Sequence, residues 1–256
     1  MIRVPAFVVI GGGVDGAGAV RRLLCAVASG RLAPCNVVVV DRDPRCPASG
    51  LAAPRPARDG GPGEVGGGRV PEVHLAVADW SEWLEANLDV LDPRAHLVPY
   101  HWAPHLLLHW LEAQLARSGA CTSRGPALGP RGLPFETATR GGDRALSYAS
   151  WPCPPACIEP DRCPHTRGPR DWSLAADLEA PRARDGFDER VVFRCLHLVW
   201  GVGTIPVADV LQGRDRLVRA GGSRSIRALV ATSSHCHGLA TALDVAPPCE
   251  REVGAT

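Results

Sequence analysis

Apolar positions in the first half of the chain alternate between two spacings. Residues 7–10 and 36–41 are short apolar, β-branched runs, typical of strands that are buried on both faces of a parallel sheet. Between them, apolar side chains recur at helical spacing over residues 20–27. A strand followed by a helix returns over residues 73–88 and again over residues 95–117. This pattern predicts four strands with helical connections.

The second half of the chain is less regular. Residues 118–190 are rich in loops and cysteine and show no sustained period. Alternation then resumes with a strand over residues 191–203, a helix over 206–218 and a strand over 225–234, and residues 238–243 predict a short final helix. Six repeats of strand and helix predict an α/β fold: a doubly wound, mostly parallel Rossmann-type sheet of about six strands with a Cys-rich loop insertion.

The domain organisation follows from the same pattern. We expect a single domain over residues 1–256. Residues 45–70 are rich in Pro, Gly and Ala without a period, which predicts a flexible surface loop. Residues 118–190 form the predicted Cys-rich insertion.

A glycine motif lies where the first strand meets the first helix. Gly11, Gly13 and Gly16 fit G-x-G-x-x-G, in which the first glycine permits a tight turn, the second admits a pyrophosphate and the third lets helix and strand pack closely. The next strand ends at Asp41, whose carboxylate is placed to accept hydrogen bonds from a ribose. These residues predict a dinucleotide site for NAD(H); the alternative is a similar sheet with an empty site.

Two charged residues complicate that prediction. Asp15 lies inside the loop, where its charge repels a pyrophosphate unless it points away. Asp41 favours NAD over NADP, but Arg42 follows and could meet a 2′-phosphate.

The segments "VVIGGGVDGAGAVRRLL", "VVVVDRDP" and "VHLAVADWSEWL" resemble the opening units of the TrkA-type, or RCK-type, NAD-binding domain. The resemblance covers about residues 5–90 and implies nucleotide contacts at Gly11, Gly13, Gly16, Asp41 and, near the adenine, Asp79. Asp79 also fits a helix N-cap with Glu82 three residues on. No ion-channel segment accompanies the resemblance, so potassium regulation is not implied. A weaker likeness, to the dehydrogenase domain of sirohaem synthases, fits Asp41 and the cysteines poorly.

Three cysteines and several prolines are concentrated in residues 151–165. Cys153, Cys157 and Cys163 have the spacing C-x3-C-x5-C, and prolines stiffen the segment between them. Together with a fourth ligand they predict a zinc or [4Fe–4S] site. Cys236, just past the last predicted strand, is our candidate for that ligand, and His165 is the alternative. A redox-active dithiol and a loop with incidental thiols remain open.

Two histidines lie one helical turn apart, at His105 and His109. Such a pair can chelate zinc, and His105 could face a substrate. We expect instead a solvated or half-buried face of the helix.

Composition narrows the function. The formal net charge of +1 gives no electrostatic reason to expect nucleic acid or a membrane surface as a partner. No apolar run is long enough for a transmembrane helix and no signal peptide is evident, so we expect a cytoplasmic protein. All 28 basic residues are arginine, which excludes a Schiff-base lysine, a P-loop lysine and a Tyr/Lys dehydrogenase pair. In a reducing compartment, ten cysteines favour metal or redox chemistry over disulfides.

These observations predict an NAD(H)-binding redox protein, an oxidoreductase with an adjacent Cys-ligated metal or iron–sulfur site. The alternative is a non-enzymatic nucleotide or redox sensor with a structural zinc. No nucleophile–base set is recognisable in the sequence, which argues against a hydrolase. The substrate and the oligomeric state are not predicted.

Overall fold

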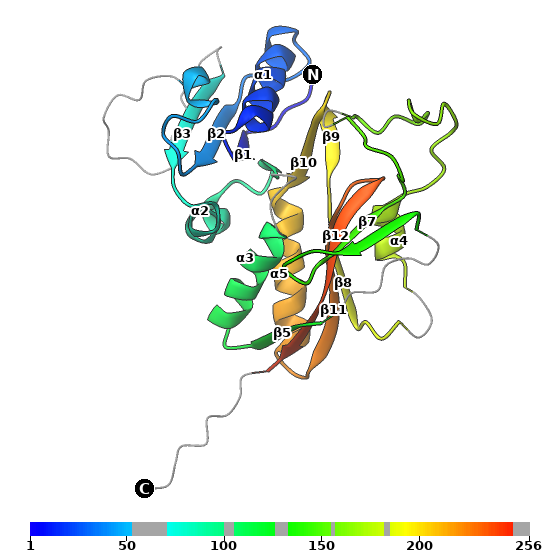
Figure 1. Ribbon diagram of the computed structural model, residues 1–256. Helices are drawn as coiled ribbons and strands as arrows, with labels where there is room; N and C mark the ends of the chain where they lie inside the picture. Colours follow the sequence, from blue (N-terminus) through cyan, green and yellow to red (C-terminus); the bar gives the residue numbers. More distant parts are fainter. Residues whose placement is uncertain (53–70, 100–104, 126–132, 155–156, 182–184, 248–256) are drawn as a thin grey trace, which may run out of the picture. The chain divides into compact units, whose positions relative to one another are not determined.

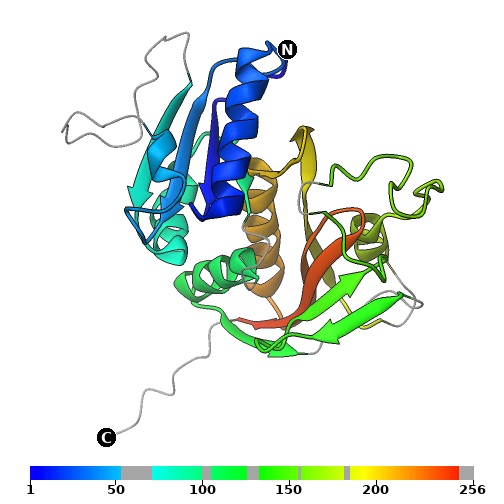
Figure 2. The ribbon, with the colours of Figure 1, turned by 45° about the horizontal axis from the view of Figure 1, so that its top comes forward.

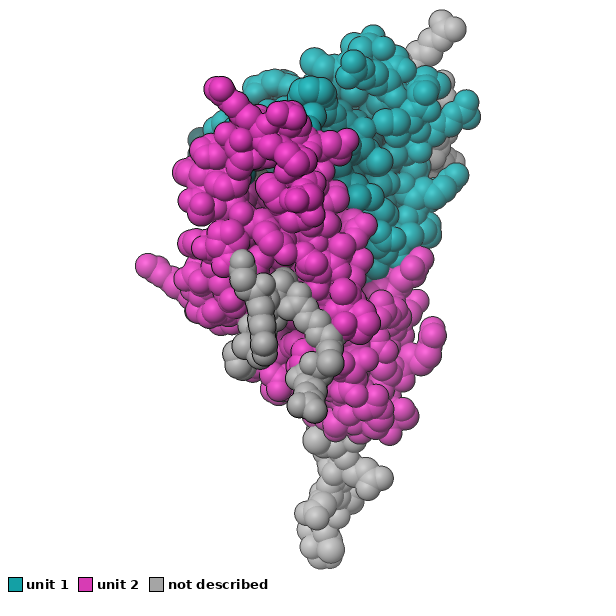
Figure 3. Space-filling view, turned by 90° about the vertical axis from the view of Figure 1, so that its right-hand side faces the viewer, with its two compact units in different colours: residues 1–103, 153–160, 195–211 teal, residues 104–152, 161–194, 212–256 magenta. Residues whose placement is uncertain are grey.

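The computed structural model describes residues 1–52, 71–99, 105–125, 133–154, 157–181 and 185–247. The chain divides into two compact units, which Figure 3 distinguishes by colour. Unit 1 comprises residues 1–103, 153–160 and 195–211, and unit 2 comprises residues 104–152, 161–194 and 212–256. Among the described residues, no helix has the length and apolar character needed to cross a membrane.

The sheet of unit 1 has a parallel part and an antiparallel edge (Figure 1). Its strand order is β3-β2-β1-β4-β10-β9. Among β1, β2, β3 and β4, all paired strands are parallel, whereas β10 runs antiparallel to both β4 and β9. The strands are β1 (Ala6–Ile10), β2 (Asn36–Asp41), β3 (Glu72–Val77), β4 (His96–Val98), β9 (Leu196–Val199) and β10 (Val202–Pro206).

Helix α1 (Val14–Ala28) connects β1 to β2 and packs against the sheet (Figure 2). Its apolar face is completely buried at Ala17, Val20 and Leu23, at the helical spacing seen in the sequence. The helix ends where Gly30 adopts φ +69°, a left-handed conformation that glycine reaches without strain. Unit 1 also contains η1 (Ser49–Leu51), α2 (Trp80–Asn87) and η2 (Leu88–Val90).

The sheet of unit 2 is mainly antiparallel. Its order is β6-β7-β12-β11-β8, with β5 paired to the far part of β12. Among the described strands, β8 and β11 are parallel and the other pairs are antiparallel. The strands are β5 (Cys121–Gly125), β6 (Phe135–Ala138), β7 (Arg144–Ser147), β8 (Glu189–Arg194), β11 (Ile226–Ser233) and β12 (His237–Ala246).

Two helices of unit 2 pack on this sheet. Helix α3 (Leu106–Arg117) contacts β5 and β11, and α4 (Leu174–Glu179) contacts β8, β11 and β12. The core beneath α4 consists of Leu146, Leu174, Leu178, Leu229, Ala231 and Ala240. Helix α5 (Val207–Gly221) continues from β10, and a Cβ at its Gly213 would lie 2.7 Å from a methyl of Val191, so only glycine permits this close approach to β8.

The predicted fold class is wrong, because the chain forms two mixed sheets instead of one mostly parallel, doubly wound Rossmann-type sheet. The single strand predicted over residues 191–203 is three strands. β8 belongs to the second sheet, while β9 and β10 form a hairpin in the first, closed by a turn in which Gly201 has φ +68°. The final helix predicted over residues 238–243 is part of β12.

The predicted Cys-rich loop insertion, residues 118–190, contributes β5, β6, β7 and α4 to unit 2. The other predicted loop spans residues 45–70, and its residues 53–70 lie outside the described residues. The first strands and helices agree with the sequence pattern. β1 to β4, α1 and α2 all lie where it places them, and α3 begins at Leu106 within the helix predicted over residues 104–117.

Candidate functional site

The glycine loop joins β1 to α1 in unit 1, and two of its glycines are required by the loop itself. Gly11 has φ +86°, a conformation that L side chains rarely adopt. A Cβ at Gly16 would lie 1.8 Å from the carbonyl oxygen of Gly11, so a side chain there would push α1 away from the strand. Gly12 is confined by packing, because its Cβ would lie 2.3 Å from Sγ of Cys46, a side-chain atom.

Gly13 differs from these three glycines. It is the N-cap of α1 with φ −61° and ψ −167°, a conformation open to any residue. Its two chain neighbours aside, no atom of the residues that the structure describes lies within 4 Å of the position a Cβ would take. Nothing in the fold requires glycine here, so the absent side chain leaves space at the N-terminus of α1.

The N-terminus of α1 carries the N–H groups of its first turn, which have no acceptors within the helix. Gly13 provides no side-chain cap for them. The exposed side chain of Val14 (78%) marks the first helical position, and Asp15 places an acidic group in the same turn. The helix end therefore combines the partial positive charge of its dipole with one opposing carboxylate.

Asp41 ends β2 beside the loop. Its Oδ2 accepts a hydrogen bond from the backbone N–H of Gly12 (2.6 Å), and its Oδ1 accepts one from Asp43 (2.8 Å). These bonds fix the carboxylate against the glycine loop. Each carboxylate oxygen has a further lone pair, so the half-buried Asp41 can still accept hydrogen bonds from a ligand.

Asp79 is the N-cap of α2. Its Oδ1 accepts hydrogen bonds from the N–H groups of Ser81 (2.8 Å) and Glu82 (3.1 Å), and its Oδ2 forms an ion pair with Arg42. The hydrogen bond from Glu82, together with those from Arg42 and Ser81, lowers the pKa of the Asp79 carboxyl. The structure thus gives Asp79 a capping role and pairs it with the arginine that follows Asp41.

The four cysteines predicted as metal ligands fall in different surroundings. Cys153 and Cys157 belong to unit 1, and Sγ of Cys157 accepts a hydrogen bond from the N–H of Glu159 (3.4 Å). Cys163 and Cys236 belong to unit 2. Among the residues that the structure describes, no three His, Cys, Asp or Glu side chains are grouped so that they could hold a metal ion. The zinc or [4Fe–4S] site stays a prediction.

Cys163 begins a tight loop that favours its thiolate. Its N–H bonds to the carbonyl of Gly168 (3.0 Å), and its carbonyl accepts from Arg167 (2.8 Å), which closes the loop. The backbone N–H of Thr166 lowers the pKa of the Cys163 thiol, helped by the Thr166 hydroxyl, the N–H of His165 and the charge of Arg170. The alternative ligand, His165, instead stacks on Trp151 with ring centroids 4.5 Å apart.

Cys195 and Cys236 are held differently. Burial raises the pKa of the Cys195 thiol to about 12, and the negative charge of Glu159 adds to that rise. Sγ of Cys236 accepts a hydrogen bond from the indole N–H of Trp172 (3.4 Å), and the residue is 7% exposed. A thiol whose pKa is raised, as at Cys195, is protonated at neutral pH and reacts slowly.

His105 is buried in unit 2, contrary to the expected solvated or half-buried face. It is 1% exposed. Among the described residues, neither ring nitrogen has a hydrogen-bond partner of acceptable geometry, although the carbonyl of Val230 faces the ring. Burial lowers the pKa of the imidazole to about 4 against the opposing charge of Asp143. The ring is therefore neutral at pH 7.

The structure also brings together two residues that the sequence did not single out. Oγ of Ser147 lies 3.0 Å from Nδ1 of His237. The two are 90 positions apart in the chain. No local motif joins them, so only the pairing of β7 with β12 reveals them.

One family model matches residues 107–246, which is more than half of the chain, and it is described as "Uncharacterized protein, C-terminal domain". No curated protein and no solved structure matches the chain. The predicted resemblance to TrkA-type or RCK-type domains is wrong, because no such NAD-binding family matches and the matched residues lie outside the region that carried it. The glycine motif and the acid at the next strand end are too widely shared to identify that family.

Proposed function

This chain belongs to the family described as "Uncharacterized protein, C-terminal domain", whose description states no activity, and we propose that its unit 1 binds NAD(H) at the glycine loop. The pyrophosphate lies at the N-terminus of α1, and Asp41 accepts hydrogen bonds from the adenosine ribose. The proposal rests on the geometry of this loop and not on membership of any known nucleotide-binding family.

Gly13 is the observation that carries the proposal. The other glycines of the loop are explained by backbone conformation or by packing, but the described residues leave the Cβ position of Gly13 empty. A ligand that approaches the backbone closely accounts for glycine at such a position. The N–H groups and the dipole of α1 then favour an anion, as in other phosphate sites at helix N-termini.

Charge around Asp41 favours NAD(H) over NADP(H). The carboxylate of Asp41 would repel a 2′-phosphate, and the neighbouring cation, Arg42, is paired with Asp79. A 2′-phosphate would therefore compete with Asp79 for the positive charge of Arg42.

We keep the oxidoreductase as the working function, with the nucleotide sensor as the alternative. Oxidation of NADH by generic electron acceptors distinguishes them, because the enzyme turns NADH over and the sensor only binds it. The Cys-ligated metal is tested separately by elemental analysis of anaerobically purified protein.

Calorimetric titration of the full chain with NADH tests the site itself. Gly13→Val fills the empty space and should weaken binding by about tenfold or more, the equivalent of about 1.4 kcal/mol. Gly50→Val is the matched control, because the Cβ of Gly50 also meets nothing within 4 Å but lies outside the loop. Unchanged affinity in Gly13→Val would contradict the proposal.

Asp15→Asn provides a test in the opposite direction. Removing the carboxylate from the first turn of α1 should tighten NADH binding by about two- to fivefold, as expected for one charge at a helix end. Weaker binding in this variant would place the phosphates elsewhere.

A further inference from the structure

Antiparallel pairing in unit 2 places a hydroxyl opposite an imidazole. Ser147 is the last residue of β7, His237 is the first residue of β12, and the two are directly paired in the register. Side chains directly opposite one another in an antiparallel pair lie on the same face with Cβ atoms about 5 Å apart. The register therefore explains the 3.0 Å separation between Ser147 Oγ and His237 Nδ1.

We propose that Ser147 and His237 are a nucleophile and its general base, and that unit 2 transfers the acyl group of small esters or thioesters. This activity is independent of nucleotide binding by unit 1. A nucleophilic serine is recognised by a hydroxyl within hydrogen-bond distance of an imidazole that can act as its base.

The hydrogen bonds at Ser147 position the oxygen for this role. Oγ accepts a hydrogen bond from the N–H of Ala149 (2.8 Å), which occupies one lone pair and fixes the oxygen in place. The single hydroxyl proton then has two acceptors within reach, Nδ1 of His237 and the carbonyl of Ala149 (2.9 Å). When Nδ1 is unprotonated it takes this proton, and the N–H of Ala149 stabilises the negative charge that develops on Oγ.

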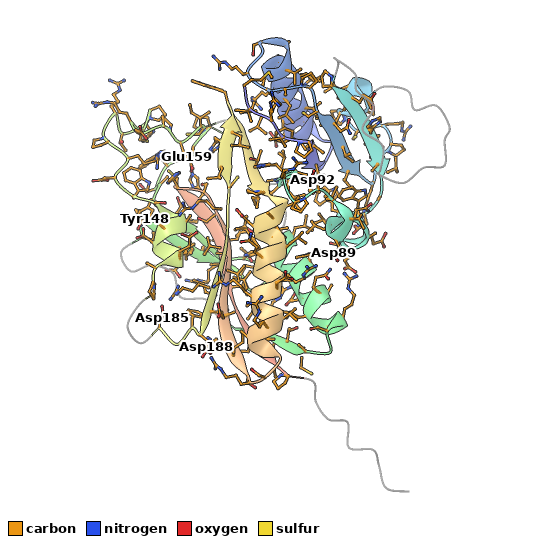
Figure 4. All side chains as sticks on the ribbon, turned by 180° about the vertical axis from the view of Figure 1, so that it is seen from behind. Asp89, Asp92, Tyr148, Glu159, Asp185 and Asp188 are labelled. Atoms are coloured by element: carbon orange, nitrogen blue, oxygen red, sulfur yellow. The ribbon has the colours of Figure 1, made fainter. Side chains whose placement is uncertain are left out.

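Exposure sets the substrate class. His237 is exposed and can exchange protons with a leaving group, whereas Ser147 is 6% exposed. The low exposure of Ser147 favours small, acetyl-sized acyl donors over bulky ones. Figure 4 labels the next residue, Tyr148, whose hydroxyl donates to Asp177 of α4 (2.5 Å) and ties this end of β7 to the helix.

The reaction balances with water as the only further reactant. Oγ of Ser147 forms a bond to the acyl carbon while its proton passes to Nδ1 of His237. The bond from the acyl carbon to the alcohol or thiol breaks, and the leaving group takes that proton from His237. Water, deprotonated by His237, then hydrolyses the acyl-serine and releases a carboxylic acid and the free hydroxyl.

Unit 2 contains a matched pair that serves as the control. Oγ of Ser173 lies 3.1 Å from Nδ1 of His235, but it also caps α4 by accepting a hydrogen bond from Ala176 (3.4 Å). The capping bond accounts for a serine at this position. His235, unlike His237, is half-buried.

Labelling of the full chain with a fluorophosphonate, followed by peptide mapping, tests the proposal. We expect one phosphonyl group on Ser147, its loss in Ser147→Ala, and its retention in Ser173→Ala. His237→Gln should slow labelling by about 100-fold, the usual contribution of a general base. Absence of label from Ser147 in the unmodified protein, or an unchanged rate in His237→Gln, would overturn the assignment.

Nitrogen NMR of the unmodified protein gives a second test that needs no variant. The ¹⁵N shifts of His237 should show a protonated Nε2 and an unprotonated Nδ1 at pH 7. A protonated Nδ1 would mean that the ring donates to Oγ as a structural bond, which would refute a role as base.

Discussion

The two units place polar groups in different ways. In unit 1, the candidate site is built from backbone N–H groups at the start of α1 and one carboxylate at the end of β2, all within 31 consecutive residues from Gly11 to Asp41. In unit 2, the candidate pair consists of two side chains 90 positions apart that meet through strand register. A site made from backbone depends on where side chains are absent, whereas a site made from side chains depends on correct strand pairing.

The largest expected effect comes from adding one carbon atom to the glycine loop of unit 1. Gly16→Ala would place a Cβ 1.8 Å from the Gly11 carbonyl oxygen, so strand and helix must separate. We expect a loss of about 3 kcal/mol in the free energy of unfolding, which outweighs the roughly 1 kcal/mol that alanine contributes to helix propensity. Urea denaturation measures the change.

Gly13→Ala is the control for that substitution. Its Cβ meets no atom of the described residues beyond its chain neighbours, so the free energy of unfolding should stay within about 0.5 kcal/mol of that of the unmodified chain. Equal destabilisation by both substitutions would contradict the distinction between a packing glycine and a ligand-facing glycine.

The loss of stability in acid tests a buried histidine of unit 2. The pKa of His105 is lowered to about 4 in the folded chain, and an unfolded histidine titrates near 6.5. Its contribution to stability is complete above pH 6.5 and is lost as the pH falls toward 4, on the order of 3 kcal/mol in total. Asp143, His109 and Arg124 are the charged or titratable groups that act on its ring.

Denaturation at a series of pH values should show this loss, and His105→Leu should reduce it. At pH 7 the variant should be no less stable than the unmodified chain, because neither ring nitrogen has a hydrogen-bond partner of acceptable geometry among the described residues. His109→Leu is the control on the same helix and should keep most of the acid loss, because the charge of His109 is a smaller cause of the lowered pKa of His105 than burial. His96, whose pKa burial also lowers, contributes in both variants. An unchanged acid limb in His105→Leu would contradict the buried neutral ring.

Thiol reactivity sharpens the comparison, since Cys163 is a unit 2 side chain controlled by backbone N–H groups. Iodoacetamide at pH 7 should modify Cys163 about tenfold or more faster than Cys195, because the pKa of Cys163 is lowered and that of Cys195 is raised to about 12. This difference in pKa should outweigh access, since Cys163 is only 8% exposed. Mass spectrometry of the alkylated peptides measures both rates. Thr166→Val removes the hydroxyl that donates to the Cys163 thiolate and should slow the reaction of Cys163. Faster modification of Cys195 than of Cys163 would contradict the prediction.

The smallest effect concerns the choice of nucleotide. Asp79→Asn removes the charge paired with Arg42 while asparagine still caps α2. The ratio of NADP to NAD affinity should rise by at most about fivefold, as expected for one exposed ion pair. Asp79→Ala is the control, because it removes both the charge and the side-chain cap of α2 and so shows the effect of losing the cap. An unchanged ratio would mean that Arg42 does not meet a 2′-phosphate.

Sequence patterns located the elements of unit 1 because each one is signalled locally. Val37, Val39 and Val40 are completely buried in β2, as the continuous apolar run predicts. The glycine loop follows directly from residues 11–16. The pairing of Arg42 with Asp79 was not predicted, since it depends on how α2 follows β3.

Unit 2 shows why the remaining elements could not be predicted. In β12, residues 240–243 are buried consecutively, so the apolar run lacks the alternation of a strand and fits a short helix equally well. In residues 191–203 the apolar run continues through three strands, and only the turn at Gly201 and the different partners of β8 and β9 separate them. Ser147 and His237 meet through the register of β7 with β12, which could not be predicted while β12 was assigned to a helix.

The central claim, that the N-terminus of α1 receives the phosphates of NADH, is tested most directly by following backbone amide resonances during an NADH titration. We predict large shifts for the N–H groups of residues 12–16 and smaller shifts at Asp41 and Asp43, while β12 stays unchanged. Saturable binding that moves other residues and leaves residues 12–16 unaffected, or no binding at millimolar NADH, would contradict the claim.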